Sequence, residues 1–228
     1  MTTRKKKILY HCFLTFIPVI GLLLPQMSHA QAVFASNLAN TPNGSFSVAN
    51  NSWVAQEFIW EGLIVNGVEL TPNLLLNSVQ LQMDAASGNP GGFTVSIYTA
   101  GASLHPGTIL GTLSGESNPQ TPGLFTYTTP GITLTPAASY FVVMTDTTSA
   151  FQGSYNWSTT TSSGIANNNL VISDVYDTSA DGANWNASLR QSIIPQMALF
   201  GTPVPEPSPW PWSICGAGLL YFVRCRKA

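Results

Sequence analysis

The sequence predicts an all-β fold, an antiparallel β-sandwich or jelly roll, flanked by an N-terminal signal helix and a short C-terminal hydrophobic helix. Short runs of β-branched and aromatic residues recur between clusters of Gly, Pro, Asn and Ser, and helical periodicity is hard to find between the two ends. Each end combines an apolar stretch with a basic one. We therefore divide the chain into a signal peptide (1–30), a leader (31–50), a β-domain (51–203) and a tail (204–228).

The N-terminal segment has the three-part layout of a secretory signal peptide. Four basic residues at positions 4–7 precede an apolar stretch from Ile8 to Leu24, and small residues occupy both key positions of Ser28-His29-Ala30. We expect cleavage between Ala30 and Gln31. The alternative is an uncleaved membrane anchor, which a proline and a glycine inside the apolar stretch disfavour.

The clearest strand of the domain is Ser78–Asp84, in which Val79, Leu81 and Met83 alternate with polar residues. Phe93–Tyr98 repeats this pattern after a Gly-rich loop, and the two segments are expected to form a hairpin. Further strands are expected at Ser45–Ala49, Trp53–Trp60, Thr108–Ser114, Leu124–Thr128, Ser139–Thr145, Tyr155–Thr159, Asn169–Asp174 and Gln196–Gly201. Tyr140–Met144 is almost continuously apolar, which favours a central strand covered on both faces.

Four segments in this order carry a resemblance to a known family. They are Trp53–Phe58, Phe93–Tyr98, Pro106–Gly115, and Leu134-Thr135-Pro136 leading into Ser139–Val143. Together they resemble the choice-of-anchor type R family over roughly residues 51–201. That family has no established activity, so the resemblance implies a fold and leaves the biochemistry open.

The C-terminal tail has three parts in a fixed order. Val204-Pro205-Glu206-Pro207-Ser208 precedes an apolar run from Trp210 to Val223, and a basic end follows at residues 224–227. This layout resembles the PEP-CTERM tail, which implies sorting by exosortase, a membrane-embedded cysteine transpeptidase, with Pro205, Glu206 and Pro207 as its recognition motif. The run is short for a full membrane span, and a plain C-terminal anchor is the alternative. The basic end is expected on the cytoplasmic side.

The charges are distributed unevenly along the chain. Residues 31–203 contain nine carboxylates and a single cation, Arg190, for a net charge of about −8, whereas the chain as a whole carries −2. A domain with one cation cannot neutralise a run of phosphates, so nucleic acid is excluded as an expected partner. All three cysteines lie in the terminal segments, which leaves no disulfide within the domain.

Catalytic equipment is scarce, and we predict no catalytic residue and no enzymatic activity. Residues 31–203 contain no cysteine or lysine and one histidine, His105, which is expected to be exposed in a turn before a strand. One histidine with scattered acids makes no recognisable zinc site, and no pair of carboxylates stands out for glycosidase chemistry. A secreted hydrolase stays the least favoured alternative.

Residue types suggest two further candidate sites, and each set of residues could instead have a purely structural role. Asp174, Asp177 and Asp181 lie in one short stretch with Gly182 and could offer oxygen ligands to calcium, although a solvated turn is favoured.

Tyr155, Trp157 and Trp185 have amide neighbours and could stack on sugars, although such rings are more often part of a core.

The predicted function is an exported, non-enzymatic surface or matrix protein of a Gram-negative bacterium, handled by the secretion machinery and exosortase and transiently anchored in the inner membrane. The PEP-CTERM resemblance implies association with extracellular polysaccharide and biofilm. The alternative function is a carbohydrate-binding module.

Overall fold

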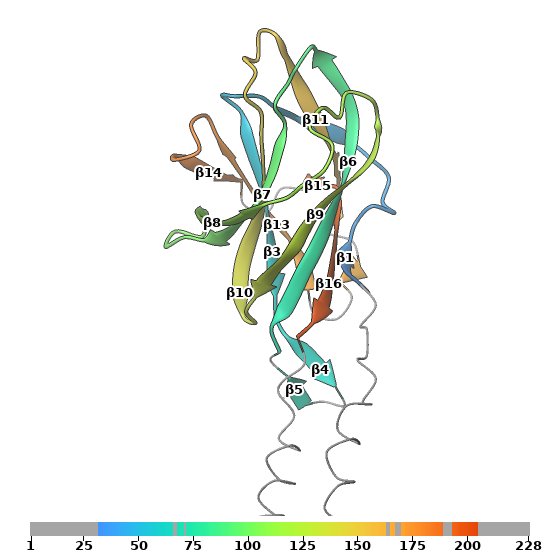
Figure 1. Cartoon of the computed structure of the whole chain (residues 1–228), viewed down its shortest axis with the longest axis vertical. Coiled ribbons are helices and arrows are strands. Elements are labelled where there is room, and N and C mark those ends of the chain that lie inside the picture. Colours follow the sequence, from blue (N-terminus) through green and yellow to red (C-terminus); the bar gives the residue numbers. More distant parts are fainter. Residues whose placement is uncertain are drawn as a thin grey trace, which may run out of the picture. The chain divides into compact units, whose positions relative to one another are not determined.

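The computed structural model describes residues 32–65, 68–70, 72–162, 165–166, 170–188 and 193–204. In these ranges the chain forms strands and no helix, and every strand pairing is antiparallel. Two sheets pack face to face as a sandwich around one large apolar core, so the predicted all-β sandwich is confirmed (Figure 1).

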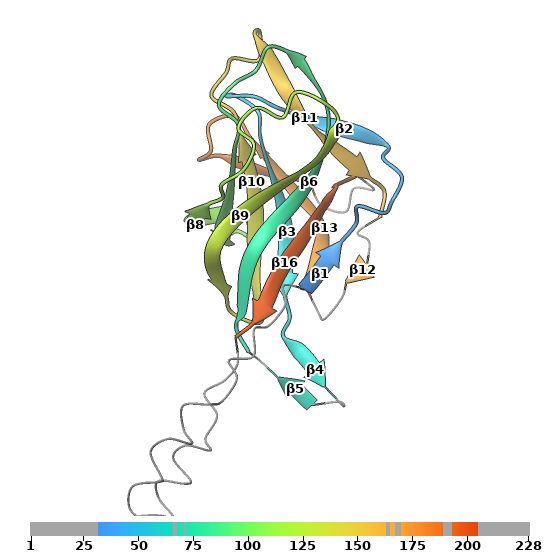
Figure 2. The ribbon, with the colours of Figure 1, turned by 45° about the vertical axis from the view of Figure 1, so that its right-hand side comes forward.

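The larger sheet has eight strands. Its order along one path is β12-β1-β16-β6-β11-β15, while β2 pairs with β11 and β9 pairs with β6. Figure 2 shows β1, β16, β6 and β9 side by side. The strands are β1 (Ala32–Ser36), β2 (Gly44–Val48), β6 (Leu74–Gly88), β9 (Gly123–Leu134), β11 (Gly153–Thr160), β12 (Ile165–Ala166), β15 (Ile194–Pro195) and β16 (Met197–Pro203).

The second sheet has six strands in the order β14-β13-β3-β10-β7-β8. Its strands are β3 (Trp53–Trp60), β7 (Thr94–Ala100), β8 (Pro106–Thr112), β10 (Ala138–Thr145), β13 (Leu170–Ser179) and β14 (Trp185–Ser188). A separate pair, β4 (Leu63–Val65) and β5 (Val68–Leu70), forms a two-stranded sheet between β3 and β6 in the chain.

The alternation of β6 confirms the predicted inward face. Val79, Leu81 and Met83 are fully buried, while Gln80 and Gln82 between them stay partly exposed. Tyr140–Met144 lies in β10 between β3 and β7 and is buried throughout, as expected for a central strand. Aromatic rings supply much of the core volume, among them Trp60, Trp157, Tyr127, Tyr155, Phe34 and Phe58.

The predicted hairpin between Ser78–Asp84 and Phe93–Tyr98 is wrong. The first segment lies in β6 and the second leads into β7, and these strands belong to different sheets. The loop between them is held by the β10–β11 loop instead, since Asn89 N–H donates to Gln152 O at 2.8 Å. Alternation shows which face of a strand is apolar and carries no information about its partner.

Residues 32–48, treated above as a leader, form two strands of the larger sheet. Asn37 binds this segment to the C-terminal strands β15 and β16. Its Nδ2 donates to Pro195 O at 2.9 Å, and its Oδ1 accepts from Met197 N–H at 2.7 Å. Gln196 adds a bond from its Nε2 to Asn40 O at 2.7 Å. The sandwich therefore starts at β1.

Candidate functional site

The six-stranded sheet carries a second apolar cluster on the face that points away from the core. Ala55, Phe141 and Val143 are fully buried there, whereas their neighbours in the same strands, such as Val54 and Val142, point into the sandwich core. Partly buried residues from β3, β7 and β14 complete the cluster, namely Trp53, Tyr98, Ala100 and Trp185. The outer face of a two-layer sandwich is normally solvated, so this face must have a cover.

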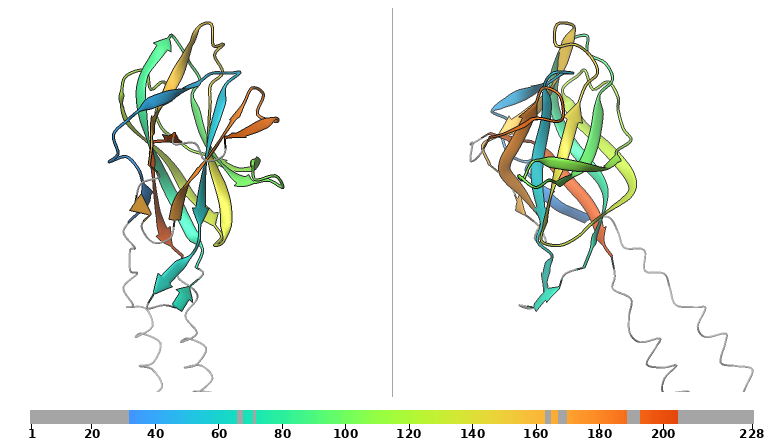
Figure 3. Two further views of the ribbon diagram at one scale, coloured as in Figure 1. Left: turned by 180° about the vertical axis from the view of Figure 1, so that it is seen from behind. Right: turned by 90° about the vertical axis from the view of Figure 1, so that its left-hand side faces the viewer.

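The tip of the β7–β8 hairpin supplies this cover. In the sheet order, β8 lies four strands away from β13, which would separate the two by roughly 20 Å if the sheet were flat. A residue at the start of β8 nevertheless contacts β13 directly. Register shifts between Ile97 and Tyr98 and between Tyr98 and Ala100 mark where the hairpin bends. In the right-hand view of Figure 3, the green β8 crosses in front of this sheet.

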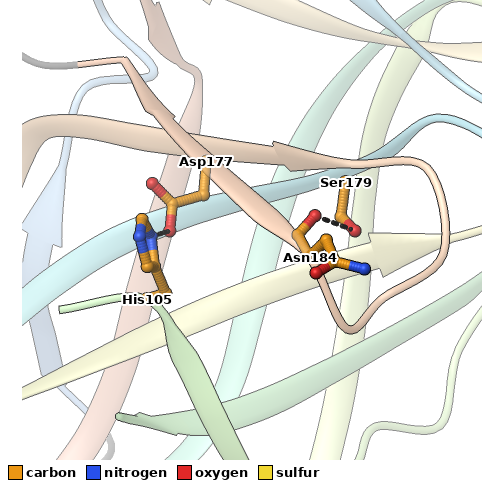
Figure 4. A network of polar contacts seen from close by, with 4 residues as sticks. All are labelled: His105, Asp177, Ser179 and Asn184. Carbon is orange, nitrogen blue, oxygen red and sulfur yellow. Dashed lines mark hydrogen bonds and ion pairs between the residues drawn. The ribbon is translucent and has the colours of Figure 1, made fainter. Parts of the chain in front are cut away.

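His105 makes the contact between the hairpin and β13. Its Nδ1 lies 2.8 Å from Oδ2 of Asp177, and the side chains are 30% and 0% exposed, respectively (Figure 4). Asp177 is paired with Ala55 of β3, which places it on the covered outer face. The predicted turn at Ala102–Gly107 is present, but His105 is not the freely exposed side chain that we expected.

Two acidic side chains lie under this cover. Asp177 and Glu57 are 0% and 6% exposed, and Oδ1 of Asp177 has no hydrogen-bond partner. Burial raises the pKa of Asp177, the hydrogen bond and charge of His105 oppose this shift, and the Glu57 charge adds to it. The described residues contain no lysine or arginine, so His105 is their source of positive charge at this site.

The turn that presents His105 is tight and strained. Gly101 N–H donates to His105 O at 2.7 Å, and Leu104 N–H donates back to Gly101 O at 3.1 Å. Leu104 has a φ of 56°, a conformation that is unfavourable for a leucine, and its side chain is 64% exposed. A backbone that keeps this conformation without burying the side chain is held in place by its neighbours.

The three aspartates proposed for calcium are not brought together. Asp174 is exposed, Asp177 is bonded to His105, and Asp181 closes its own turn by accepting backbone N–H groups of Ala183 and Asn184 on Oδ1 at 2.9 and 2.8 Å. The backbone hydrogen bond from Asn184, together with the other bonds to this carboxylate, holds the pKa of Asp181 well below its usual range. In the described part of the chain, no group of three His, Cys, Asp or Glu side chains is arranged to hold a metal ion.

The proposed sugar-stacking platform is wrong for two of its three rings. Tyr155 and Trp157 are fully buried, because both occupy the inward face of β11. Their polar atoms bond within the protein: Trp157 Nε1 donates to Gln196 O at 2.9 Å, and Tyr155 Oη donates to Asn118 Oδ1 at 2.7 Å. Trp185 is only partly buried and packs edge-on against Trp53, with 6.3 Å between ring centroids.

A third buried acid, Asp146, lies where β10 ends. It is 3% exposed; its Oδ1 accepts Thr148 N–H at 2.8 Å, and its Oδ2 has no partner. Burial raises the pKa of Asp146, and burial together with the charges of Asp146 and Glu116 raises the pKa of Tyr155 to about 12. The sequence offered no signal for this site, because nothing distinguishes Asp146 from an ordinary acid after a strand.

The residues of both terminal signals lie outside the described part of the chain. These are Ala30 and Gln31 at the expected cleavage site and Pro205, Glu206 and Pro207 of the sorting motif. Within the described residues, no helix has the length and hydropathy to cross a membrane. Comparison with known protein families, curated proteins and solved structures finds no match for this chain.

The His105–Asp177 pair contains two of the three parts of a catalytic triad. A carboxylate that orients an imidazole needs a hydroxyl or thiol within reach of the other ring nitrogen to form a nucleophilic site. The described residues contain no cysteine. Ser179 follows Asp177 on β13, but its Oγ donates to Asn184 O at 2.7 Å and accepts Gly182 N–H at 2.8 Å (Figure 4). The pair joins the β7–β8 hairpin to β13.

Proposed function

We propose that this chain is an exported, non-enzymatic surface or matrix protein that exosortase sorts through its C-terminal tail. The signal-peptide layout of residues 1–30 and the tripartite layout of residues 204–228 support this function. Such a protein would reach the envelope of a Gram-negative bacterium through the general secretion machinery, with transient anchoring in the inner membrane.

One observation carries the proposal further, namely the position of the two ends of the sandwich. Ala32 at the start of β1 is paired with Gly201 near the end of β16, so the chain enters and leaves the domain at the same end of the sheet (Figure 2). After export, a domain whose two connections share one end can stay folded while its leader and tail are processed, because both expected cleavage sites lie outside its strands.

The opposite end of the sandwich is free to face outward. Leu74 of β6 is paired with Pro203 at the connected end, and Gly88 at the far end of β6 is paired with Gly153. This strand has 15 residues, so the two ends lie roughly 45 Å apart. The loops at the far end bear polar side chains and one fully exposed ring, Phe151. We propose extracellular polysaccharide as the matrix component with which this acidic domain associates.

The test is to determine the termini of the protein by mass spectrometry of material recovered from the surface and medium of its own cells. We expect a mature N-terminus at Gln31 and a C-terminus at or near Pro205–Pro207. Joint replacement of Pro205, Glu206 and Pro207 by alanine should leave the tail attached, and Ser208→Ala serves as the matched control. Mature protein that still carries Trp210–Ala228 would overturn the sorting proposal.

A carbohydrate-binding role is the second candidate, and the position of Trp185 favours it. This ring is partly exposed beside Trp53, and its neighbours Asn184 and Asn186 are exposed. We expect Trp185→Ala to weaken retention on a bound polysaccharide about tenfold, because the substitution removes the apolar ring surface that a stacked sugar would cover, and burial of a large apolar side chain contributes on the order of 1.5–3 kcal/mol. Leu124→Ala removes an exposed apolar side chain of β9 and is the control. Equal retention of both variants would reject this role for Trp185.

A further inference from the structure

We propose that His105 and Asp177 form a charge-dependent latch, which holds the tip of the β7–β8 hairpin over the outer face of the six-stranded sheet most tightly while the imidazole is protonated and loosens when the imidazole is neutral. The proposal is independent of how the chain is sorted. It assigns to this domain a covered apolar surface and a condition under which the surface opens.

The two ends of the β7–β8 hairpin differ in the hydrogen bonds that hold them to the rest of the domain. At the Thr112 end, Thr112 shares a 3.0 Å hydrogen bond with Ser96, and Ser114 bridges to Thr128 of β9. At the tip, the bonds of Thr99 and Thr108 stay within the hairpin. Among the described residues, the side-chain hydrogen bond that ties this tip to another element is the one from His105 to Asp177. Loss of that bond leaves the tip held by apolar contacts alone.

The charges around the pair explain why its protonation matters. His105 is bonded to the buried carboxylate of Asp177 in β13, and the charge of Glu57, a second buried acid in β3, acts on that same carboxylate. A neutral His105 leaves both negative charges in a poorly solvated place without a cation, which is costly. The raised pKa of Asp177 has the same origin, since burial disfavours its charged form.

The remaining neighbours do not change this balance. β10 presents Phe141 and Val143 to the cluster, β7 presents the phenol of Tyr98, and β14 has no acidic or basic residue. The other acids of the β13–β14 region point elsewhere: Asp174 is exposed, and Asp181 is bonded within its own turn.

The strain in the tip favours release. Leu104 has a φ of 56°, and Gly107 and Gly101 approach so closely that a Cβ on Gly107 would lie 2.9 Å from Gly101 N. A turn held in this conformation relaxes when its fastening is lost. Release would expose Ala55, Phe141 and Val143 together with the inner sides of Trp53 and Trp185, which makes a continuous apolar surface.

Hydrogen–deuterium exchange of the full chain, read by mass spectrometry from about pH 6 to about pH 9, tests the latch. Rates are corrected for the intrinsic pH dependence of exchange. We expect the protection of the β8 amides to fall about tenfold or more over this range, which spans the titration of an imidazole, while β6 amides keep theirs. Protection of β8 that stays flat with pH in the natural sequence would overturn the proposal.

Three variants separate the latch from a general loss of stability. His105→Gln should leave β8 weakly protected at every pH, and Asp177→Asn should remove the pH dependence. Asp84→Asn is the matched control, because Asp84 accepts a 2.8 Å bond from Ser158 in the other sheet, and its β8 protection should follow that of the natural sequence. Protection of β6 reports whether each variant is folded. A folded Asp177→Asn or His105→Gln variant that kept the natural pH dependence would contradict the latch.

Discussion

The imidazole of His105 is hydrogen-bonded to the carboxylate of Asp177 at 2.8 Å, although the two residues are 72 positions apart in the sequence and their strands are four positions apart in the sheet. The contact exists because the β7–β8 hairpin bends over the outer face of its own sheet. It creates a second buried layer on a face that a sandwich usually leaves to solvent.

Buried acids should make the folded domain less stable as the pH rises. Burial raises the pKa of both Asp146 and Asp177 above the value in the unfolded chain. The folded state therefore binds protons more tightly than the unfolded state, and stability is lost as the pH rises through the folded pKa values. Urea unfolding from about pH 4 to about pH 8 should show a falling free energy of unfolding, with a shallower fall in Asp146→Asn.

A steeper or unchanged slope in Asp146→Asn would contradict this assignment. Asp84→Asn is the control here as well, since Asp84 is partly exposed and hydrogen-bonded to Ser158.

Ala137→Gly should stabilise the domain. Ala137 has a φ of 56° and an exposed side chain, and its N–H donates to Trp60 O at 2.7 Å. A glycine adopts this conformation without the penalty of roughly 1–2 kcal/mol that a Cβ carries, and part of that gain is offset by the greater freedom of glycine in the unfolded chain. We expect a gain of about 0.5–1 kcal/mol in urea unfolding. Ala85→Gly, at an exposed position of β6, should be destabilising by a similar amount.

Trp157→Ala should be among the most destabilising single substitutions in the domain. The ring is fully buried and its Nε1 donates to Gln196 O, so the substitution leaves a large cavity and removes one of the two hydrogen bonds to a carbonyl that also accepts Gln82 N–H at 3.2 Å. We expect a loss of about 3–5 kcal/mol. Trp185→Ala should cost about 1–2 kcal/mol, because Trp185 is only partly buried. Comparable losses for the two variants in chemical denaturation would mean that Trp185 belongs to the core.

Gly182→Ala should disturb the packing of Trp53 against Trp185. Gly182 has a φ of +73°, and a Cβ at this position would overlap the ring of Trp53. The ring must then move away from Trp185, which should change the tryptophan fluorescence of the folded protein and lower its stability by about 1–3 kcal/mol. Gly123→Ala is the control, since a Cβ there meets only the Phe125 ring at ordinary contact distance. An unchanged emission spectrum in Gly182→Ala would argue against the close packing of Trp53.

Much of the strand content could be predicted because alternation is a local signal. β3 (Trp53–Trp60) was expected with its observed bounds, and β10 was expected as a central strand and lies between β3 and β7. The strands β4, β5, β12, β14 and β15 were missed, because a strand of two to four residues has too few positions to show a period of two. The five-residue β1 was missed because its segment was interpreted as part of a leader.

The functional residues divide along the same line. The predicted terminal signals rest on the order of charged, apolar and proline-containing segments, so residues 1–30 and 204–228 could be interpreted without a fold, and both interpretations stay predictions. The burial of Tyr155 and Trp157 could not be predicted in this way. Asn156 lies between them and points to the opposite face of the strand, so its polarity does not show whether the two rings face solvent or the core.

By itself, the sequence determined that this chain has an acidic β-domain with an inward-facing apolar row on strands such as β6, and it predicts a signal at each terminus, since each of these is a property of neighbouring residues. Only the tertiary structure decided that β6 and β7 lie in different sheets and that His105 reaches Asp177. The physical reason is that partner choice and hairpin bending depend on which surfaces bury one another across the whole domain, and no period along the chain records that.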